Sequence, residues 1–296
     1  MKTAVVTDTN SAISVEEGKR FGIYVLPMPV MIDGETFFEG KDLDYDRLWS
    51  AFEENRTIST SMPSVGDLME LWNYVLDEEG YEGLVYLPMS SGLSGSCHTA
   101  KALAAEYGGR VQVVDNHRIS YTLMNSVFDA LEMAKRGMDA AAIREELERG
   151  AMESSIYITV NSLRYLVKSG RVTEGAARIG DILHLKPVLQ IQGSKLDAYA
   201  KARGMNNAID KMISAIRNDL GQRFAGIPKE ELSLGTAGTL RTQEEQETWR
   251  KRIEQEFPGF RVLYRPLSCS IACHVGTDAI GTAVTRIHYD QSEYSL

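Results

Sequence analysis

Short apolar segments alternate with helical segments through the first half of this chain. Five segments have the length and composition of buried strands: residues 4–6, 23–26, 84–87, 111–114 and 156–160. Most of the residues between them have the apolar spacing of amphipathic helices. Strands that alternate with helices favour a parallel sheet covered on both faces. We therefore predict an α/β fold whose N-terminal domain has three layers around a parallel sheet.

The clearest helical pattern follows Ser64. Its apolar residues recur at the spacing of one buried face: Val65, Leu68, Met69, Trp72, Val75 and Leu76. Ser64 and Asp67 have the spacing of a capping box, in which Asp replaces the usual Glu or Gln. We expect a helix to begin directly after Ser64.

The pattern changes near residue 160. Residues 163–169 are predicted to form a helix that ends at Gly170, and residues 187–191 and 196–200 flank a turn as in a hairpin. Strands and helices continue in mixed order: a helix at 206–217, a strand at 231–234, a helix at 242–257 and a strand at 261–264. We predict two domains, 1–161 and 162–296, the second a two-layer α/β domain with a mixed sheet.

Composition limits the possible partners. The net charge of −9 lacks the basic footprint that nucleic-acid binding needs. No segment approaches the roughly 20 apolar residues of a membrane span, and the N-terminus has no apolar segment of signal-peptide length. The cysteines Cys97, Cys269 and Cys273 are too few for a disulfide framework, so we expect a cytoplasmic protein.

Two hydroxyl-rich turns point to an anion site. Residues 60–64 read Thr-Ser-Met-Pro-Ser, and residues 90–95 read Ser-Ser-Gly-Leu-Ser-Gly directly after the apolar strand 84–87. Each leads into a helix, where unpaired backbone N–H groups and the helix dipole favour negative charge. We expect the turns to form two halves of a carboxylate or phosphate site. The plainer interpretation is a loop and a helix cap.

Other chemistries are less well supported by the residues. Gly92–Ser96 misses the Gly-x-Ser-x-Gly elbow of a serine hydrolase by one position. Cys269, Cys273 and His274 lack a fourth ligand at zinc spacing, so no metal site is predicted. Gly170–Gly175 has the glycine spacing of a phosphate-binding loop, but Ala176 stands where lysine is needed.

Two acids follow buried strands. We interpret Asp115 as a turn residue that accepts local backbone N–H bonds. For Asp8 this interpretation stays open beside general acid–base catalysis and Mg²⁺ binding. Cys97 lies on an apolar helical stripe and is predicted to pack in the core.

Six short motifs occur in the order found in a known bacterial family. They are Thr7–Ser11, Thr60–Ser64, Ser90–Gly95, Ser169–Val172, Leu185–Val188 and His274–Gly276. With these motifs the chain resembles the DegV family over residues 3–286. The resemblance implies a fatty-acid-binding protein of two α/β domains, without catalytic residues or a cofactor. It also implies a role as the binding subunit of a fatty acid kinase, which presents the acyl carboxylate to a separate kinase.

The resemblance also assigns residues to roles. Thr60, Ser61, Ser91 and Gly92 would hold the carboxylate of a long-chain fatty acid such as palmitate. Arg171 and His274 would line the head-group end and contact the acyl phosphate, with the acyl chain in an apolar tunnel between the domains. From the residues alone, Arg171 reads as a solvated arginine at a helix end and His274 as a buried, hydrogen-bonded histidine. Arg178 is expected on the surface.

The chain departs from the family pattern at several positions. Asp8-Thr9-Asn10 stands where Asp-Ser-Thr is usual, and Met62 replaces a Gln. Thr277 and Asp278 replace a Pro and a Gly, and Asp278 adds negative charge near the proposed anion end. Two alternatives stay open beside the carrier: a stand-alone acyl hydrolase or transferase, and a regulatory protein that responds to a lipid.

Overall fold

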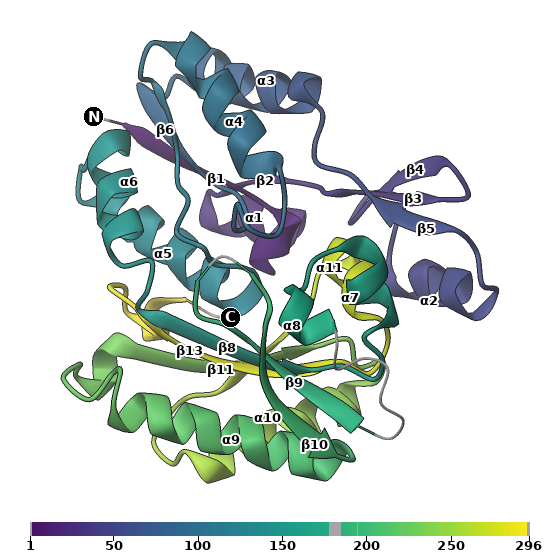
Figure 1. Ribbon diagram of the computed structural model, residues 1–296. Coiled ribbons are helices and arrows are strands. Elements are labelled where there is room, and N and C mark those ends of the chain that lie inside the picture. The colour runs from purple at the N-terminus through teal and green to yellow at the C-terminus, as the bar shows by residue number, and fades with distance from the viewer. Residues whose placement is uncertain (1, 178–184, 194, 295–296) are drawn as a thin grey trace. The chain divides into compact units, whose positions relative to one another are not determined.

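The computed structural model describes residues 2–177, 185–193 and 195–294, so Arg178 and residue 194 of the predicted hairpin turn lie outside it. The chain divides into two compact units. The first comprises Met1–Ala151 with Ser268–Ser270, and the second comprises Met152–Leu267 with Ile271–Leu296 (Figure 1). Each unit contains its own sheet and helices.

Four parallel strands form the main sheet of the first unit, in the order β2-β1-β6-β7. They are β1 (Thr3–Asp8), β2 (Tyr24–Leu26), β6 (Gly83–Leu87) and β7 (Val111–Val113). Every residue of β1 and β6 is buried. Burial on both faces explains why these strands are continuous apolar runs rather than alternating ones.

Helices cover both faces of this sheet (Figure 1). One face carries α3 (Val65–Asn73) and α4 (Ser96–Ala104), and the other carries α1 (Val15–Phe21), α5 (Ser120–Lys135) and α6 (Ala140–Arg149). Leu68, Trp72 and Cys97 of the first pair pack on Val6 and Tyr86 of the sheet. The predicted three-layer arrangement is therefore confirmed.

The predicted start of α3 is also confirmed. The Ser64 hydroxyl accepts the Asp67 N–H at 3.0 Å, and the Asp67 carboxylate accepts the Ser64 N–H at 3.2 Å, which completes the capping box. The helix continues into a π-helical turn, Tyr74–Glu78. Short 3-10 turns lie at Thr9–Ser11, Ala105–Tyr107, Lys229–Glu231 and Gln291–Glu293.

A smaller antiparallel sheet in the first unit was not predicted. It has the order β4-β3-β5 and consists of β3 (Pro29–Ile32), β4 (Glu35–Phe38) and β5 (Ile58–Thr60), with α2 (Tyr45–Glu53) between β4 and β5 in the chain. Asp33 and Gly34 turn the chain between β3 and β4 with φ of 52° and 88°. An Asp-Gly pair between two strand-like runs is a hairpin signal, so this sheet could have been found from the sequence.

The second unit contains a mixed sheet of six strands in the order β10-β9-β8-β13-β11-β12. They are β8 (Ser154–Thr159), β9 (Leu185–Ile191), β10 (Asp197–Arg203), β11 (Leu232–Gly238), β12 (Leu263–Pro266) and β13 (Ile280–Arg286). The antiparallel hairpin of β9 and β10 is as predicted. The assignment of residues 156–160 to the parallel sheet was wrong, because β8 pairs antiparallel with β9 and β13.

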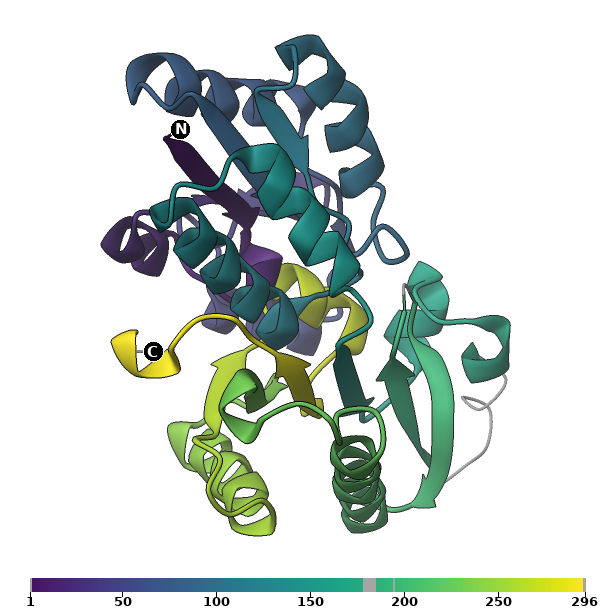
Figure 2. The same cartoon turned by 90° about the vertical axis from the view of Figure 1, so that its left-hand side faces the viewer.

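Two long helices, α9 (Met205–Gly221) and α10 (Gln243–Glu256), lie side by side on one face of this sheet (Figure 2). Met212 and Ile216 of α9 and Trp249 of α10 pack on Leu234 and Val284 of the sheet. This confirms the two-layer prediction. The other helices in this part of the chain are short: α7 (Arg164–Ser169), α8 (Glu174–Ala177) and α11 (Cys269–Val275).

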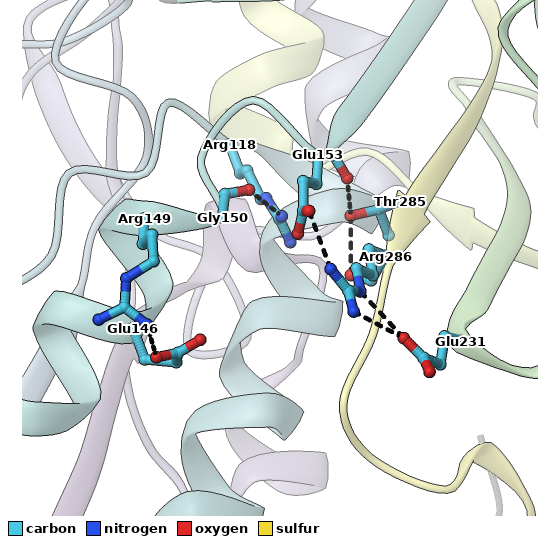
Figure 3. Close-up of polar contacts among 8 residues, drawn as sticks. All are labelled: Arg118, Glu146, Arg149, Gly150, Glu153, Glu231, Thr285 and Arg286. Carbon is cyan, nitrogen blue, oxygen red and sulfur yellow. Dashed lines mark hydrogen bonds and ion pairs between the residues drawn. The ribbon is translucent and has the colours of Figure 1, made fainter. Parts of the chain in front are cut away.

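One guanidinium group joins three neighbouring strands of this sheet (Figure 3). Arg286 at the end of β13 donates to Glu153 at 3.0 Å and to Glu231 at 2.8 Å. Glu153 directly precedes β8, and Glu231 directly precedes β11. Because β13 lies between β8 and β11, these ion pairs join the end of β13 to the residues that precede its two neighbouring strands.

Candidate functional site

The turn at residues 90–95 lies at the carboxyl end of β6, where ligands of parallel sheets bind. Its shape comes from the Ser90 carbonyl, which accepts the N–H groups of Leu93 at 3.0 Å and Ser94 at 3.2 Å. The Ser91 N–H donates to the Asp115 carboxylate at 3.2 Å, and the Gly92 N–H donates to the Ser90 hydroxyl at 3.2 Å. Asp115 therefore accepts a backbone N–H, but that of Ser91, 24 positions away, rather than the local N–H groups that the sequence predicted.

These contacts change which groups of the turn can receive a ligand. Both backbone N–H groups predicted to hold a carboxylate already have acceptors, although the bonds are long. The Ser91 side chain is half-buried, and within residues 2–177, 185–193 and 195–294 no hydrogen-bond partner of its hydroxyl is found. The Ser91 hydroxyl is therefore the donor most readily available to an anion.

The other predicted turn begins at the end of β5. Thr60, half-buried, pairs with Val30 of β3, and the Ser61 N–H lies 3.5 Å from the Pro29 carbonyl. The exposed Ser61 hydroxyl donates to the Met62 carbonyl at 2.8 Å. It must rotate away from that carbonyl before it can donate to a ligand.

The structure brings the turn at residues 60–64 into contact with α4, the helix that follows the turn at residues 90–95. The Thr99 hydroxyl in the first part of α4 donates to the sulfur of Met62 at 3.3 Å. A Cβ atom placed on Gly95 would lie 3.9 Å from the same sulfur. Met62, which departs from the family pattern, is thus the residue through which the two turns adjoin.

A buried acid lies at the carboxyl end of β1, the strand next to β6. Asp8 is fully buried, and burial raises its pKa from 3.8 to about 6, against the opposing effect of hydrogen bonds from Asn10 and from the Met89 N–H. The Asn10 N–H donates to the Asp8 carboxylate at 2.9 Å. This local bond is the one expected of a turn acid. Met89 directly precedes the turn at residues 90–95.

Sequence reasoning missed a set of buried polar residues beside Asp8. The Asn10 side-chain oxygen accepts hydrogen bonds from the hydroxyls of Ser268, at 2.8 Å, and Ser270. The carboxylate of Glu39 accepts the Cys269 N–H at 2.9 Å. Burial raises the pKa of Glu39 above its ordinary value. No local signal relates these residues, because more than 200 positions separate the partners.

Arg171 and His274 belong to the second unit. Arg171 follows Gly170, which ends α7 in the left-handed conformation as predicted, and its guanidinium donates to the Ser169 carbonyl. His274 is half-buried on α11, and burial, with a smaller effect of the Arg171 charge, lowers its pKa to about 4. Gly276, directly after α11, lets the chain lie close to α7, since an added Cβ would lie 2.9 Å from the Tyr165 ring of α7.

The remaining candidates are an exposed acid, a core cysteine and the possible metal ligands. Asp278 is exposed, with φ of 59°, and its carboxylate accepts a hydrogen bond from Asn161 at 3.3 Å. Cys97 is buried in the core as predicted, and burial raises its thiol pKa to about 12. Over the described residues, no three His, Cys, Asp or Glu side chains are grouped as metal ligands. Nor does that part of the chain contain a helix able to span a membrane.

Comparison with known proteins identifies the family. A family model described as "Uncharacterised protein, DegV family" matches residues 2–286. A DegV domain-containing protein from Deinococcus radiodurans is 30% identical over 223 residues, which cover 75% of this chain and 79% of the relative.

Two solved structures extend the likeness to the fold. One is a DegV family protein from Thermus thermophilus described for its fatty acid binding, with 25% identity and a TM-score of 0.84. The other is a fatty acid binding DegV family protein from Streptococcus agalactiae, with 26% identity and a TM-score of 0.84. Both alignments cover 97% of this chain and 100% of the relative. The chain described here belongs to the DegV family.

Proposed function

We propose that this protein binds a long-chain fatty acid such as palmitate and acts as a carrier rather than as an enzyme. The observation that carries the proposal is the pair of hydroxyl-bearing turns, joined through Met62 and Thr99 in the first unit. The Thermus and Streptococcus relatives, described as fatty acid binding and alike in fold over nearly the whole chain, support it.

In this proposal Thr60, Ser61, Ser91 and Gly92 hold the carboxylate. The Ser91 hydroxyl donates directly. The N–H groups of Ser91 and Gly92 exchange their long bonds to Asp115 and Ser90 for the ligand. An anion that receives several such donors stays ionised, because hydrogen bonds to a carboxylate favour its charged form.

The acyl chain supplies most of the affinity. Each buried methylene contributes about 0.8 kcal/mol before entropy losses, so a 16-carbon chain is held far more strongly by its tail than by its head group. The carboxylate contacts then determine orientation. We infer that Arg171 and His274 contact the head group, with His274 as a neutral imidazole at physiological pH.

We further propose that the protein presents its bound acid to a separate kinase, which forms the acyl phosphate. Such a carrier supplies no nucleophile or base of its own. Purified protein loaded with palmitate and mixed with ATP is then expected to yield no acyl phosphate until a bacterial fatty acid kinase subunit is added. Acyl phosphate formed by this chain alone would contradict the carrier role.

The head-group assignment is tested by Ser91→Ala and Thr60→Val. Both variants are expected to bind palmitate more weakly in isothermal titration calorimetry, by about tenfold to a hundredfold for each lost charged hydrogen bond. Ser59→Ala is the matched control, because Ser59 is the exposed neighbour of Thr60 on β5. Native mass spectrometry of the purified wild type should show bound lipid. Wild-type affinity in both variants would overturn the assignment, and a wild type without affinity for fatty acids would overturn the function.

A further inference from the structure

The helix that follows the turn at residues 60–64 presents apolar side chains to solvent. Seven large apolar residues are exposed in the part of the chain that the structure describes, and four of them lie between residues 62 and 74. Exposed apolar residues are normal when they are scattered, whereas a concentration of them marks a contact surface. We call Met62, Val65 and Met69 the α3 patch; their exposed fractions are 45%, 46% and 41%.

Helical spacing places these side chains together. Val65 and Met69 are four positions apart in α3, so their side chains lie one above the other on the same face of the helix. That face borders α4, because the side-chain oxygen of Asn73, four positions beyond Met69, accepts the hydroxyl of Tyr107, directly after α4, at 3.1 Å. The sulfur of Met62 accepts a hydroxyl of α4 itself at 3.3 Å. The α3 patch therefore runs along the side of α3 that adjoins α4 (Figure 1).

The surroundings of the α3 patch are acidic. Residues 62–79 contain five acids and no lysine or arginine. Asp67 and Glu70 are exposed on α3 itself. Acids repel the anionic lipids of a membrane surface, so a lipid surface is a poor occupant of this patch. An apolar centre with an acidic border instead fits a protein surface whose apolar centre is bordered by lysine or arginine.

The place of the α3 patch in the chain indicates which protein that is. Met62 directly follows Thr60 and Ser61, which are proposed to hold the carboxylate. A kinase that phosphorylates this carboxylate must bring ATP to the same part of the first unit. Its active site has to hold Mg²⁺ and basic residues for the ATP phosphates, so the surface around that site is positively charged. The acidic border of the α3 patch is complementary to such a surface.

We propose that the α3 patch is the docking surface for the kinase that phosphorylates the bound acid. Val65 and Met69 supply the apolar contact, and Glu70 attracts the basic partner towards it. Three side chains make a small interface, which suits a carrier that must leave the kinase after each transfer. The inference rests on the proposed function, because it names the surface to which the kinase of that function binds.

Val65→Glu with Met69→Glu tests the apolar contact. Two charges there are expected to raise the KM of a bacterial fatty acid kinase subunit for palmitate-loaded protein by at least about tenfold and to leave kcat unchanged. Palmitate affinity in isothermal titration calorimetry should equal that of the wild type, since neither side chain belongs to the carboxylate site. Met152→Glu is the matched control, because Met152 is an exposed methionine of the second unit. If the double variant does not fold, Val65→Ser with Met69→Gln removes the apolar contact without adding charge.

Glu70→Lys tests the electrostatic attraction. In the wild type the KM for loaded protein should rise with ionic strength, because salt screens the attraction between opposite charges. The variant should have a higher KM at low salt and a weaker dependence on salt. Glu16→Lys is the control, because it makes the same change of charge at an exposed position of α1, on the opposite face of the sheet.

The outcomes distinguish this inference from the proposed function. Wild-type KM values in the α3 variants, with a wild type that binds palmitate and is phosphorylated, would overturn the docking surface and leave the function intact. A wild type that binds no fatty acid, or whose bound acid the kinase does not phosphorylate, would overturn the function and the docking role with it.

Two further results would contradict docking of a kinase while the function stands. Folded α3 variants that lose palmitate affinity would show that the α3 patch contacts the acid itself. A wild-type dimer in analytical ultracentrifugation that dissociates in Val65→Glu would show that the patch binds a second copy of this chain.

Discussion

The buried Asp8 carboxyl makes a measurable prediction about stability and pH. Its pKa is about 6 in the folded protein and 3.8 ordinarily, so the folded state binds the Asp8 proton more tightly than the unfolded state does. As pH rises from 3.8 to 6, the unfolded chain loses this proton first and is stabilised relative to the folded one. At 1.36 kcal/mol per pH unit of pKa difference, the loss of unfolding free energy due to Asp8 approaches about 3 kcal/mol and is nearly constant well above pH 6.

Asp8→Asn removes this titration while keeping the size and an acceptor for the Asn10 N–H. The free energy of unfolding of the variant minus that of the wild type should therefore rise by about 2.4 kcal/mol between pH 4 and pH 7, because at pH 4 the unfolded carboxyl is already more than half ionised. The same background of other acids and histidines is present in both proteins and cancels in the difference. The absolute stability at either pH does not matter for the test.

Hydrogen exchange followed by mass spectrometry is the suitable assay, because it reads each unit of a two-unit chain separately. Peptides from β1 and β6 report on the first unit. Peptides from β11 belong to the second unit and serve as an internal control that should not respond to Asp8→Asn. If the difference between variant and wild type in β1 and β6 is the same at pH 4 and pH 7, Asp8 does not titrate with a raised pKa and the argument from burial is wrong.

Two other predictions concern the second unit. The His274 imidazole should titrate near pH 4 in a proton NMR titration, and Arg171→Met should raise that midpoint by removing a nearby cation; a midpoint near 6.5 in the wild type would refute the effect of burial. The lowered pKa also means that His274 costs stability as pH falls from 6.5 towards 4. Gly276→Ala should destabilise the protein by at least about 1 kcal/mol, because φ is 75° and the new Cβ would meet Tyr165. Gly221→Ala, with no atom within 4 Å of its Cβ, is the control, and equal thermal midpoints for the two variants would contradict the clash.

Local elements were predictable from the sequence because their causes are local. A capping box involves residues three positions apart, and Ser64 and Asp67 form the one expected. Gly170 ends α7 because a glycine accepts the left-handed conformation at little cost. The missed hairpin of β3 and β4 is also a local feature, since its Asp33-Gly34 turn is a hairpin signal in the sequence.

Strand partners were less predictable. Residues 156–160 are as apolar as the strands of the parallel sheet, so composition could not assign β8 to one sheet or the other. Its antiparallel pairing with β9 and β13 depends on the path of residues 160–280. A strand buried on both faces has the same continuous apolar sequence whether its neighbours are parallel or antiparallel.

The proposed site, too, was predictable from the sequence only in part. The hydroxyl-bearing turns and the order of the six motifs could be read from the chain, and they led to the DegV family. Only the structure shows that the Ser91 and Gly92 N–H groups already have acceptors and that Met62 meets Thr99.

By itself, then, the amino-acid sequence determined most of the elements, the general character of the two larger sheets and the family, because periodicity, caps and turns act over a few residues. The tertiary structure alone decided which distant groups share a hydrogen bond, as Asn10 and Ser270 do across 260 positions. The physical reason is that the buried Asn10 oxygen accepts hydrogen bonds from whichever donors the folded chain brings to it. No pattern along the sequence records that partner.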